Sequence, residues 1–534
     1  MSGDVSVGGV GRTPSRVDIY DTTLRDGSQL EGISLTVDDK LRIAEQLDWL
    51  GVHFIEGGWP GANPKDDEFF QRVHKELKLD TSKLVAFGST RRKLGKVDSD
   101  DTLRHLIEAG TGTVCIVGKC WDYHVTEALE TTLDEGVAMV GDSIEFLRGE
   151  GRNVLFDAEH FFDGFKRNPE FSLRVLEAAV IKGASTLVLC DTNGGALPHE
   201  VSAAVDAVVR QFGDDVIVGV HTHDDAGCGV ANALAGVEAG ARQVQGTING
   251  YGERTGNCNL TTMIPNLSLK MGVETIPRDR LERLTPVSHH IAELVNMPLN
   301  PQQPYVGTSA FAHKAGLHVS AIARRPDAYE HVPPDAVGNG TRFVVSELAG
   351  KSTLQLKAKE IGVELDGPTL NEVVDQLKRL EHEGYHFEAA DGSLELLMRR
   401  AAGWEQDYFT VESFRVINDE VDGRGFSTEA TVKVHVGGER VVSTAEGNGP
   451  VNALDTALRS AIGSQYPELS KVHLTDYKVR VLDTNKGTGA VTRVLIDSTD
   501  GERDWSTIGV SENIIEASWM ALFDSIVLGL LRHA

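Results

Sequence analysis

The sequence lacks the features of membrane, secreted and zinc-finger proteins. No apolar run reaches the ~18 residues that a membrane-spanning helix needs. Residues 1–15 are small and polar, so we expect a flexible tail there and no export signal. The five cysteines are odd in number and none has CxxC spacing, which favours free thiols in a cytoplasmic protein over disulfides or a zinc finger.

Positive charge is also scarce. Lys and Arg number 52 against 79 Asp and Glu, and the net charge is -27. Because nucleic acids and anionic membranes bind basic surfaces, we expect neither of them as a partner. The composition, with 40% hydrophobic and 25% charged residues, is typical of a soluble globular protein. At ~100–200 residues per domain, the length predicts two or three domains.

Eight apolar, strand-like runs alternate with amphipathic helical stretches in the first half of the chain. They begin at Val17, Phe54, Lys83, Thr113, Asn153, Thr186, Val216 and Gln243. This rhythm predicts an α/β fold, a (β/α)8 TIM barrel that forms the catalytic domain over residues 16–285. A doubly wound sheet is the alternative, and the missing GxGxxG motif after the first run disfavours it. Each run ends in polar or ionisable residues, as barrel strands do at an active site.

The second half of the chain has a different pattern. Helical stretches broken by NMPLNPQQP predict helical connector subdomains over residues 286–405. Alternating strands dominate residues 406–534, where two strands-then-helix units predict a C-terminal α+β domain with an internal repeat. Its last helix is apolar nearly all round, which suits burial against a partner subunit. A regulatory or dimerisation role is favoured for this domain because it has no cluster of catalytic residue types.

His221 and His223 follow an apolar run and are two residues apart, so both imidazoles point to the same side of the predicted strand. Asp26 follows the first run and would face them once the barrel closes. Two imidazoles and one carboxylate hold a divalent cation while leaving positions open for a substrate. Two polar histidines at a barrel mouth without a metal are the structural alternative.

The open positions of such a metal site suit a 2-oxo acid, whose carboxylate and keto oxygen chelate a cation. Arg25, beside the predicted ligand Asp26, would polarise the keto oxygen and stabilise the alkoxide that forms on attack. Its alternative role is a salt bridge within the barrel mouth. Glu159, after the fifth run, is a candidate acid/base residue or else a hydrogen-bonded structural glutamate.

Three motifs resemble the signatures of the 2-isopropylmalate, homocitrate and citramalate synthase family. They are DTTLRDGSQ at 21–29, HTHDDAGCG at 221–229 and NGYGERTGN at 249–257. Three further stretches look like the citramalate synthase branch: EGGWPGANPKD at 56–66, VGKCWDYHVTEAL at 117–129 and FDAEHFFDGFKRNPEF at 156–171. The likeness extends to a C-terminal domain similar to the allosteric leucine- or isoleucine-binding domain of these synthases.

The resemblance implies a role for each matching residue. Asp26, His221 and His223 would be metal ligands, with Asn257 completing or supporting the site. Arg25 would polarise the keto group, Thr192 would hold the substrate carboxylate, and Glu159 would take part in acid/base catalysis. His318 and Tyr329 match a connector pair that reaches the neighbouring subunit's barrel, which implies a homodimer. Asp157 departs from the family, since some citramalate synthases have a tyrosine there on the pyruvate pocket wall.

The resemblance also implies an activity. Acetyl-CoA and pyruvate would condense and the thioester would be hydrolysed to (R)-citramalate and CoA, the first step of a pyruvate route to isoleucine. Mg²⁺ or Mn²⁺ is favoured over Zn²⁺ as the metal, and isoleucine is the expected effector.

Four alternatives stay open. A 2-isopropylmalate synthase would use 2-oxoisovalerate, and extra methyl groups change specificity by only ~1–3 kcal/mol. A related acyl-CoA lyase shares the metal motif. An iron oxygenase lacks support, because its His-x-Asp order and jelly-roll pattern are missing. A non-catalytic metal-binding protein is the fourth.

Overall fold

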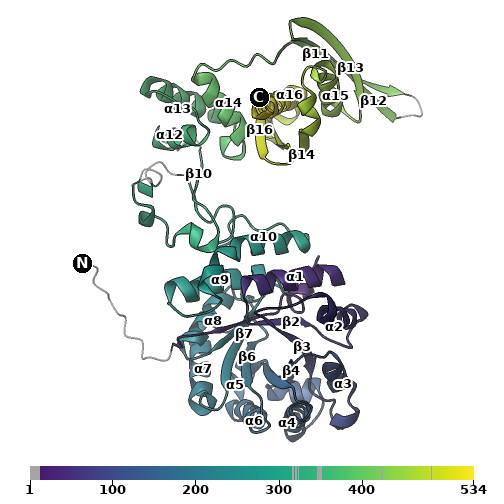
Figure 1. Ribbon diagram of the computed structural model, residues 1–534, viewed down its shortest axis with the longest axis vertical. Helices are drawn as coiled ribbons and strands as arrows, with labels where there is room; N and C mark the ends of the chain where they lie inside the picture. Colours follow the sequence, from purple (N-terminus) through teal and green to yellow (C-terminus); the bar gives the residue numbers. More distant parts are fainter. Residues whose placement is uncertain are drawn as a thin grey trace. The chain divides into compact units, whose positions relative to one another are not determined.

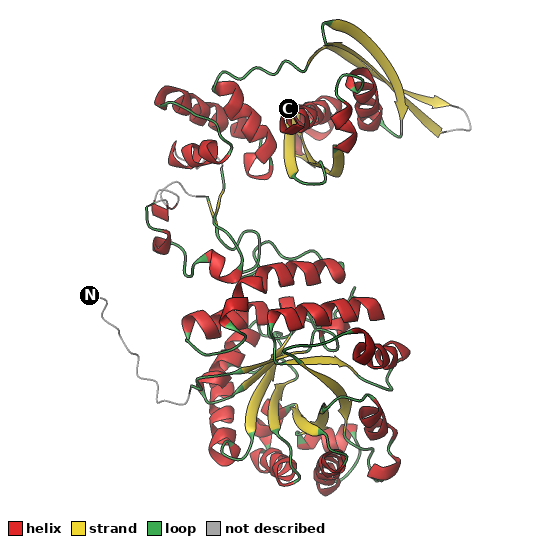
Figure 2. Cartoon of the chain, viewed as in Figure 1, coloured by secondary structure: helices red, strands yellow, loops and turns green. Residues whose placement is uncertain are grey.

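The computed structural model describes residues 13–314, 318, 321–322, 324–345, 351–421, 425–482 and 484–533. The chain forms two compact units. The first comprises Met1–Phe311 and His331–Gly340, and the second comprises Ala312–Glu330 and Thr341–Ala534. Figure 1 labels the elements of each unit, and Figure 2 colours them by type.

The first unit is built on a closed barrel of eight parallel strands. They are β1 (Asp18–Asp21), β2 (Phe54–Gly58), β3 (Lys83–Ser89), β4 (Thr113–Lys119), β5 (Asn153–Glu159), β6 (Thr186–Asp191), β7 (Ile217–Thr222) and β8 (Gln243–Gly246). Each strand pairs with the next in sequence, and β8 closes the barrel on β1 with Asp18 opposite Gln243. The predicted (β/α)8 barrel is confirmed.

Helices surround the strands on the outside of the barrel (Figure 1). They are α1 (Val37–Leu50), α2 (Pro64–Glu76), α3 (Asp101–Glu108), α4 (Leu133–Gly149), α5 (Phe161–Arg167), α6 (Pro169–Ile181), α7 (Pro198–Phe212), α8 (Gly229–Glu238), α9 (Leu260–Pro265) and α10 (Leu284–Leu294). Local sequence defines where they start: Thr36 and Asp39 form a capping box at α1. The strands are buried on both faces, which is why β6 is buried at every residue.

The second unit begins with a short ladder and three helices. The ladder pairs β9 (Ala312–His313) with β10 (Arg342–Phe343), and the helices are α12 (Lys351–Glu360), α13 (Gly367–His382) and α14 (Asp391–Ala401). Apolar residues of α12, α13 and α14, including Leu354, Val373 and Met398, share one buried cluster. The predicted helical connector is therefore present.

Two three-stranded antiparallel sheets follow, each ending in a helix. The first copy is β11 (Phe409–Val421), β12 (Gly425–Val436), β13 (Glu439–Gly447) and α15 (Pro450–Ile462). The second is β14 (His473–Val481), β15 (Thr492–Thr499), β16 (Asp504–Ser511) and α16 (Ile514–His533). The predicted α+β domain with an internal repeat is confirmed.

The last helix, α16, is mostly buried within its own unit. Ala517, Ile526 and Leu528 are fully buried in the cluster that also holds residues of α15 and the sheets. Among the described residues, α16 alone is long and apolar enough to cross a membrane, with 61% of its most apolar window buried. Core helices of globular proteins pass the same test, and burial in this unit accounts for the apolar surface. Contact with a partner subunit stays a prediction.

Candidate active site at the barrel mouth

Arg25 and Asp26 lie in a turn after β1, a few residues beyond the strand end that the sequence suggested. The carboxylate of Asp21 starts this turn by accepting hydrogen bonds from the Thr23 backbone N–H and hydroxyl, both at 2.9 Å. The Thr23 hydroxyl in turn accepts from the Ile248 N–H at 2.9 Å, which ties the turn to the segment after β8. The turn is therefore fixed at the ends of β1 and β8, and it carries Asp26 to within 3.2 Å of His221.

Asp26, His221 and His223 converge as the sequence predicts. His221 Nε2 lies 3.2 Å from Asp26 Oδ2 and 3.3 Å from His223 Nε2, while His223 Nε2 lies 4.0 Å from Asp26 Oδ2. All three side chains are buried and their donor atoms lie within 4.8 Å of one another. Ligand bonds of ~2.0–2.2 Å separate neighbouring ligands of one cation by about 3 Å. The three donors therefore fit a single divalent ion.

Asn257 lies against the same cluster. Its Nδ2 donates to Asp26 Oδ2 at 2.8 Å and lies 3.1 Å from His221 Nε2. Its Oδ1 is buried without a hydrogen-bond partner. Turning the amide over would direct this oxygen, a ligand type that hard cations accept, toward Asp26. The arrangement therefore suits a supporting ligand better than a purely structural amide.

The charges of the cluster also favour a cation. Burial opposes ionisation of Asp26, but the positive charge of Arg25 and the hydrogen bond with His221 outweigh it and lower the pKa of Asp26. Burial opposes protonation of His221 too, yet the hydrogen bond and charge of Asp26 raise its pKa. Burial and the neighbouring His221 lower the pKa of His223 to about 4. A divalent cation binding here would displace the proton that His221 otherwise shares with Asp26.

Arg25 is held between two carboxylates and an aromatic ring. Its Nε donates to Glu56 Oε1 at 2.6 Å, its Nη1 lies 3.5 Å from Asp26 Oδ1, and its Cζ lies 3.9 Å from the Phe87 ring centroid. Burial opposes its charge, but Asp26 and Glu56 raise its pKa and keep it cationic. Arg25 also borders a cavity of about 500 Å³ that Trp59 and Lys65 help to line. The guanidinium therefore presents a fixed positive charge next to the cluster.

Thr192 and Glu159 occupy different places around this cluster. Arg254 links Thr192 to the cluster, because its Nη2 donates to the Thr192 carbonyl at 2.9 Å and lies 3.3 Å from His223 Nδ1. The Thr192 hydroxyl accepts from the His160 N–H at 2.9 Å. Glu159 instead forms an ion pair with Lys119, and both line a cavity of about 560 Å³ at the barrel mouth. Glu159 is therefore at the mouth but not among the cluster's direct contacts.

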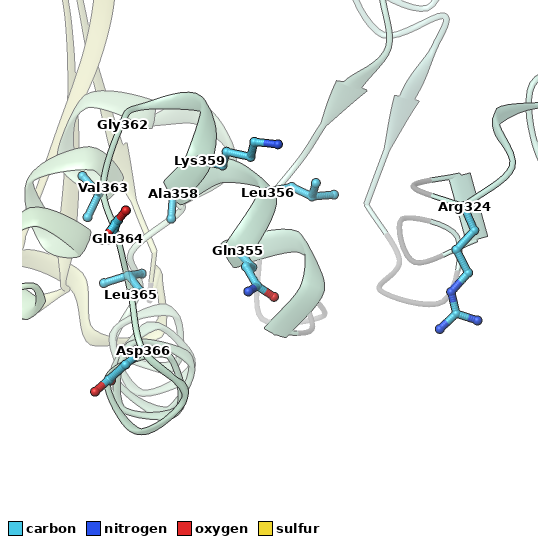
Figure 3. Close-up of a pocket in the computed structure, with 10 residues that line it drawn as sticks. All are labelled: Arg324, Gln355, Leu356, Ala358, Lys359, Gly362, Val363, Glu364, Leu365 and Asp366. Atoms are coloured by element: carbon cyan, nitrogen blue, oxygen red, sulfur yellow. The ribbon is translucent and has the colours of Figure 1, made fainter.

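His318 and Tyr329 belong to the second unit. Their rings stack with centroids 4.1 Å apart at an interplanar angle of 27°, and Tyr329 is 48% exposed. The two rings therefore contact each other within this unit, and the role that the resemblance implies for them stays a prediction. The same unit has a cavity of about 890 Å³ along α12 and the loop before α13 (Figure 3), and no predicted site residue lines it among the residues described.

Sequence reasoning missed a polar network inside the barrel. Gln245 Oε1 lies 2.7 Å from His221 Nδ1, and Gln245 Nε2 donates to Asp157 Oδ1 at 3.0 Å. The Tyr20 hydroxyl donates to Glu56 at 2.5 Å. Polar residues inside otherwise apolar runs were the available signal, since a buried polar group needs a partner.

Comparison with known families covers nearly the whole chain. The "HMGL-like" model matches residues 16–288. The "homocitrate synthase post-HMGL domain-like" model matches residues 305–385, and the "LeuA allosteric (dimerisation) domain" model matches residues 388–529.

Three named relatives are similar over nearly the whole chain. The (R)-citramalate synthase of Aquifex aeolicus is 53% identical over 520 residues, covering 97% of this chain and 98% of the relative. That of Streptomyces coelicolor is 52% identical over 517 residues, or 96% of each chain. A probable 2-isopropylmalate synthase of Methanopyrus kandleri is 33% identical over 507 residues, covering 95% of this chain and 96% of the relative. Among solved structures, an HMG-CoA lyase of Bacillus subtilis is 20% identical with a TM-score of 0.46, covering 54% of this chain and 96% of that one.

Proposed function

The chain belongs to the (R)-citramalate synthase family, and we propose that the Asp26, His221 and His223 cluster is the site where it condenses acetyl-CoA with pyruvate. The enzyme is an acyltransferase that releases (R)-citramalate and CoA. The observation that carries the assignment of the site is the approach of the three donor atoms to within 4.8 Å of one another beside the cationic Arg25.

The family is metal-dependent. We propose Mg²⁺ or Mn²⁺ as the metal in preference to Zn²⁺, because a hard cation readily binds the oxygen atoms of a carboxylate and of a keto acid. When bound, the cation supplies a Lewis acid that polarises the keto group of pyruvate. Asp26, His221 and His223 would hold it, and Asn257 would support them. This part of the proposal rests on the short donor separations and the burial of all three side chains.

The remaining residues would handle the charges and protons of the reaction. A base removes a methyl proton from acetyl-CoA, a carbon–carbon bond forms at the keto carbon, and the keto oxygen becomes an alkoxide that is then protonated. Arg25 would stabilise that oxygen, and Thr192 would hold the pyruvate carboxylate. Glu159 would move a proton at the barrel mouth, where it lies in an ion pair with Lys119. Water then hydrolyses the thioester and releases CoA, which makes the sequence effectively irreversible.

Pyruvate is favoured over 2-oxoisovalerate by the relatives. Two citramalate synthases are 52–53% identical to this chain, against 33% for the probable 2-isopropylmalate synthase. The test is CoA release from acetyl-CoA with each of several 2-oxo acids. We expect the highest kcat/KM with pyruvate, and a higher value with 2-oxoisovalerate would reassign the substrate. Absence of CoA release with every 2-oxo acid would reassign the reaction class.

The C-terminal domain supports a regulated homodimer. Residues 388–529 match an allosteric dimerisation domain. We propose that isoleucine is the effector. We also propose that His318 and Tyr329 complete the active site in the barrel of the partner subunit. Isothermal titration that detects no isoleucine binding would remove the effector, and a monomer in analytical ultracentrifugation would remove the shared site.

Two further parts of the proposal concern organisation. We propose a division into a catalytic barrel (16–285), a connector (286–405) and a regulatory domain (406–534), and the HMGL-like match over residues 16–288 supports the first of these. The tail predicted at residues 1–15 lies largely outside the described residues. We also propose a cytoplasmic location, supported by the five free cysteines.

A further inference from the structure

Gln245 lies beside His221 of the proposed metal-binding cluster, as its register partner on the neighbouring strand. It is on β8, its side chain is fully buried, and its carboxamide spans two partners from other strands. Gln245 Oε1 lies 2.7 Å from His221 Nδ1, and Gln245 Nε2 lies 3.0 Å from Asp157 Oδ1. The carboxamide therefore connects a proposed metal ligand to a buried carboxyl group.

The direction of these two hydrogen bonds is determined by Asp157. Cys115 Sγ also donates to Asp157 Oδ1, at 3.1 Å, so two donors converge on one carboxyl oxygen. That oxygen acts as an acceptor whether or not the other one carries a proton. Gln245 accordingly turns its N–H group toward Asp157 and its carbonyl oxygen toward His221.

The orientation of Gln245 decides which nitrogen of His221 carries hydrogen. A carbonyl oxygen can only accept, so His221 Nδ1 carries the hydrogen and donates it. In the neutral ring, Nε2 then has the free lone pair, and Nε2 is the atom that lies 3.2 Å from Asp26 Oδ2. His223 has no such acceptor: its Nδ1 faces the donor Arg254 Nη2 at 3.3 Å, so its hydrogen lies on Nε2 and must leave that nitrogen before a cation binds there.

We propose that Gln245 is a positioning residue for the metal site: with Asp157, it holds His221 in the tautomer whose Nε2 can bind a divalent cation. The inference rests on the metal site of the proposed function. It also gives a role to Asp157, which stands where some citramalate synthases have a tyrosine. Removing an acceptor behind a metal-binding histidine typically lowers metal affinity ~10–100-fold.

Gln243 is a matched control on the same strand. It is two residues from Gln245, so both side chains lie on the same face of β8, and both are fully buried. Neither Nε2 nor Oε1 of Gln243 has a hydrogen-bond partner. Gln243→Leu and Gln245→Leu therefore make the same change in the same strand, but only Gln245→Leu removes a contact with His221.

The experiment measures Mn²⁺ binding to the metal-free full chain by electron paramagnetic resonance, without substrate. We expect Gln245→Leu to weaken Mn²⁺ binding ~10–100-fold and Gln243→Leu to leave it unchanged. Gln245→Glu keeps an oxygen that accepts from His221, so it should bind Mn²⁺ more tightly than Gln245→Leu. At saturating Mn²⁺, Gln245→Leu should recover most of its CoA release, because the substitution raises the apparent Kd for Mn²⁺ more than it lowers kcat.

Two results would overturn the inference: Gln245→Leu binding Mn²⁺ as tightly as the unmodified chain, or Gln243→Leu losing as much affinity. If Gln245→Leu does not fold, Gln245→Glu is measured in its place. The inference would then be overturned if the folded Gln245→Glu chain bound Mn²⁺ as weakly as His221→Ala does. A chain that binds Mn²⁺ but releases no CoA from acetyl-CoA and pyruvate would contradict the proposed function, while the Mn²⁺ affinities would still test the role of Gln245.

Discussion

Arg25 and Glu56 form a buried ion pair in which Arg25 Nε donates to Glu56 Oε1 at 2.6 Å. Phe87 supports the guanidinium from one face, with its ring centroid 3.9 Å from Cζ. The pair uses one edge of the guanidinium and leaves Nη1 near Asp26. The charge that the reaction needs is therefore oriented before any substrate binds.

Arg25→Lys should keep the positive charge but lose this orientation. Lysine has no planar fork, so it cannot donate to Glu56 and face the substrate oxygen at once. We expect kcat to fall ~10²–10³-fold with a smaller change in the KM for pyruvate, as for loss of an oriented donor. Steady-state CoA release measures both. Arg72→Lys, in a surface ion-pair cluster, is the control. An unchanged kcat would contradict the role of Arg25.

Gly252 provides room for Asn257. A Cβ added at Gly252 would lie 1.9 Å from Asn257 Oδ1, so Gly252→Ala must displace that amide from the cluster. We expect weaker Mn²⁺ binding and lower CoA release with the circular dichroism spectrum retained. Gly195→Ala is the matched control, because a Cβ there meets nothing within 4 Å. Equal effects of both variants would argue against a role for Asn257 in the metal site.

Metal removal should lower stability only when the cluster is intact. A cation at 100 times its Kd stabilises the folded chain by ~2.7 kcal/mol, and a chelator removes that contribution. We expect EDTA to lower the Tm of the unmodified chain and to leave the Tm of His223→Ala unchanged. Differential scanning calorimetry measures both, and an equal decrease in the two proteins would place the stabilising cation elsewhere.

Because Asp21 is buried, the free energy of unfolding should decrease as pH rises. Burial raises its pKa to about 7, although the hydrogen bonds from Thr23 oppose this. Between the unfolded pKa and about 7, the unfolded chain has lost a proton that the folded chain keeps, so the free energy of unfolding decreases with pH by about 1.4 kcal/mol per unit. Asp21→Asn should remove this slope in urea unfolding between about pH 5.5 and 7. Asp38→Asn, on the surface, should retain it.

The barrel was predictable because its strands are buried on both faces. Each then has a continuous apolar run, as in TLVLCD of β6, and such runs are visible without knowing their neighbours. His221 and His223 were found for a similar reason, since the two-residue spacing sets their common side locally. The terminal repeat was visible in the sequence as two sets of alternating strands, each followed by a helical stretch.

Contacts set by strand register could not be predicted. Lys119 lies opposite Glu159 only because β4 and β5 pair in one register, and that register places the predicted acid/base residue Glu159 in an ion pair. Gln245 contacts His221 for the same reason, through the pairing of β7 with β8. The apolar α16 suggested a partner subunit, whereas its own unit already buries most of it, because sequence patterning cannot tell these neighbours apart.

The most direct test titrates the metal-stripped chain with Mn²⁺ while CoA release from acetyl-CoA and pyruvate is followed. Activity should rise in proportion to bound Mn²⁺ and level off at one ion per chain, and Asp26→Asn and His223→Ala should stay inactive at the same Mn²⁺ concentration while remaining folded. Full CoA release in the presence of a chelator, or in either variant, would contradict condensation at a cation held by Asp26, His221 and His223.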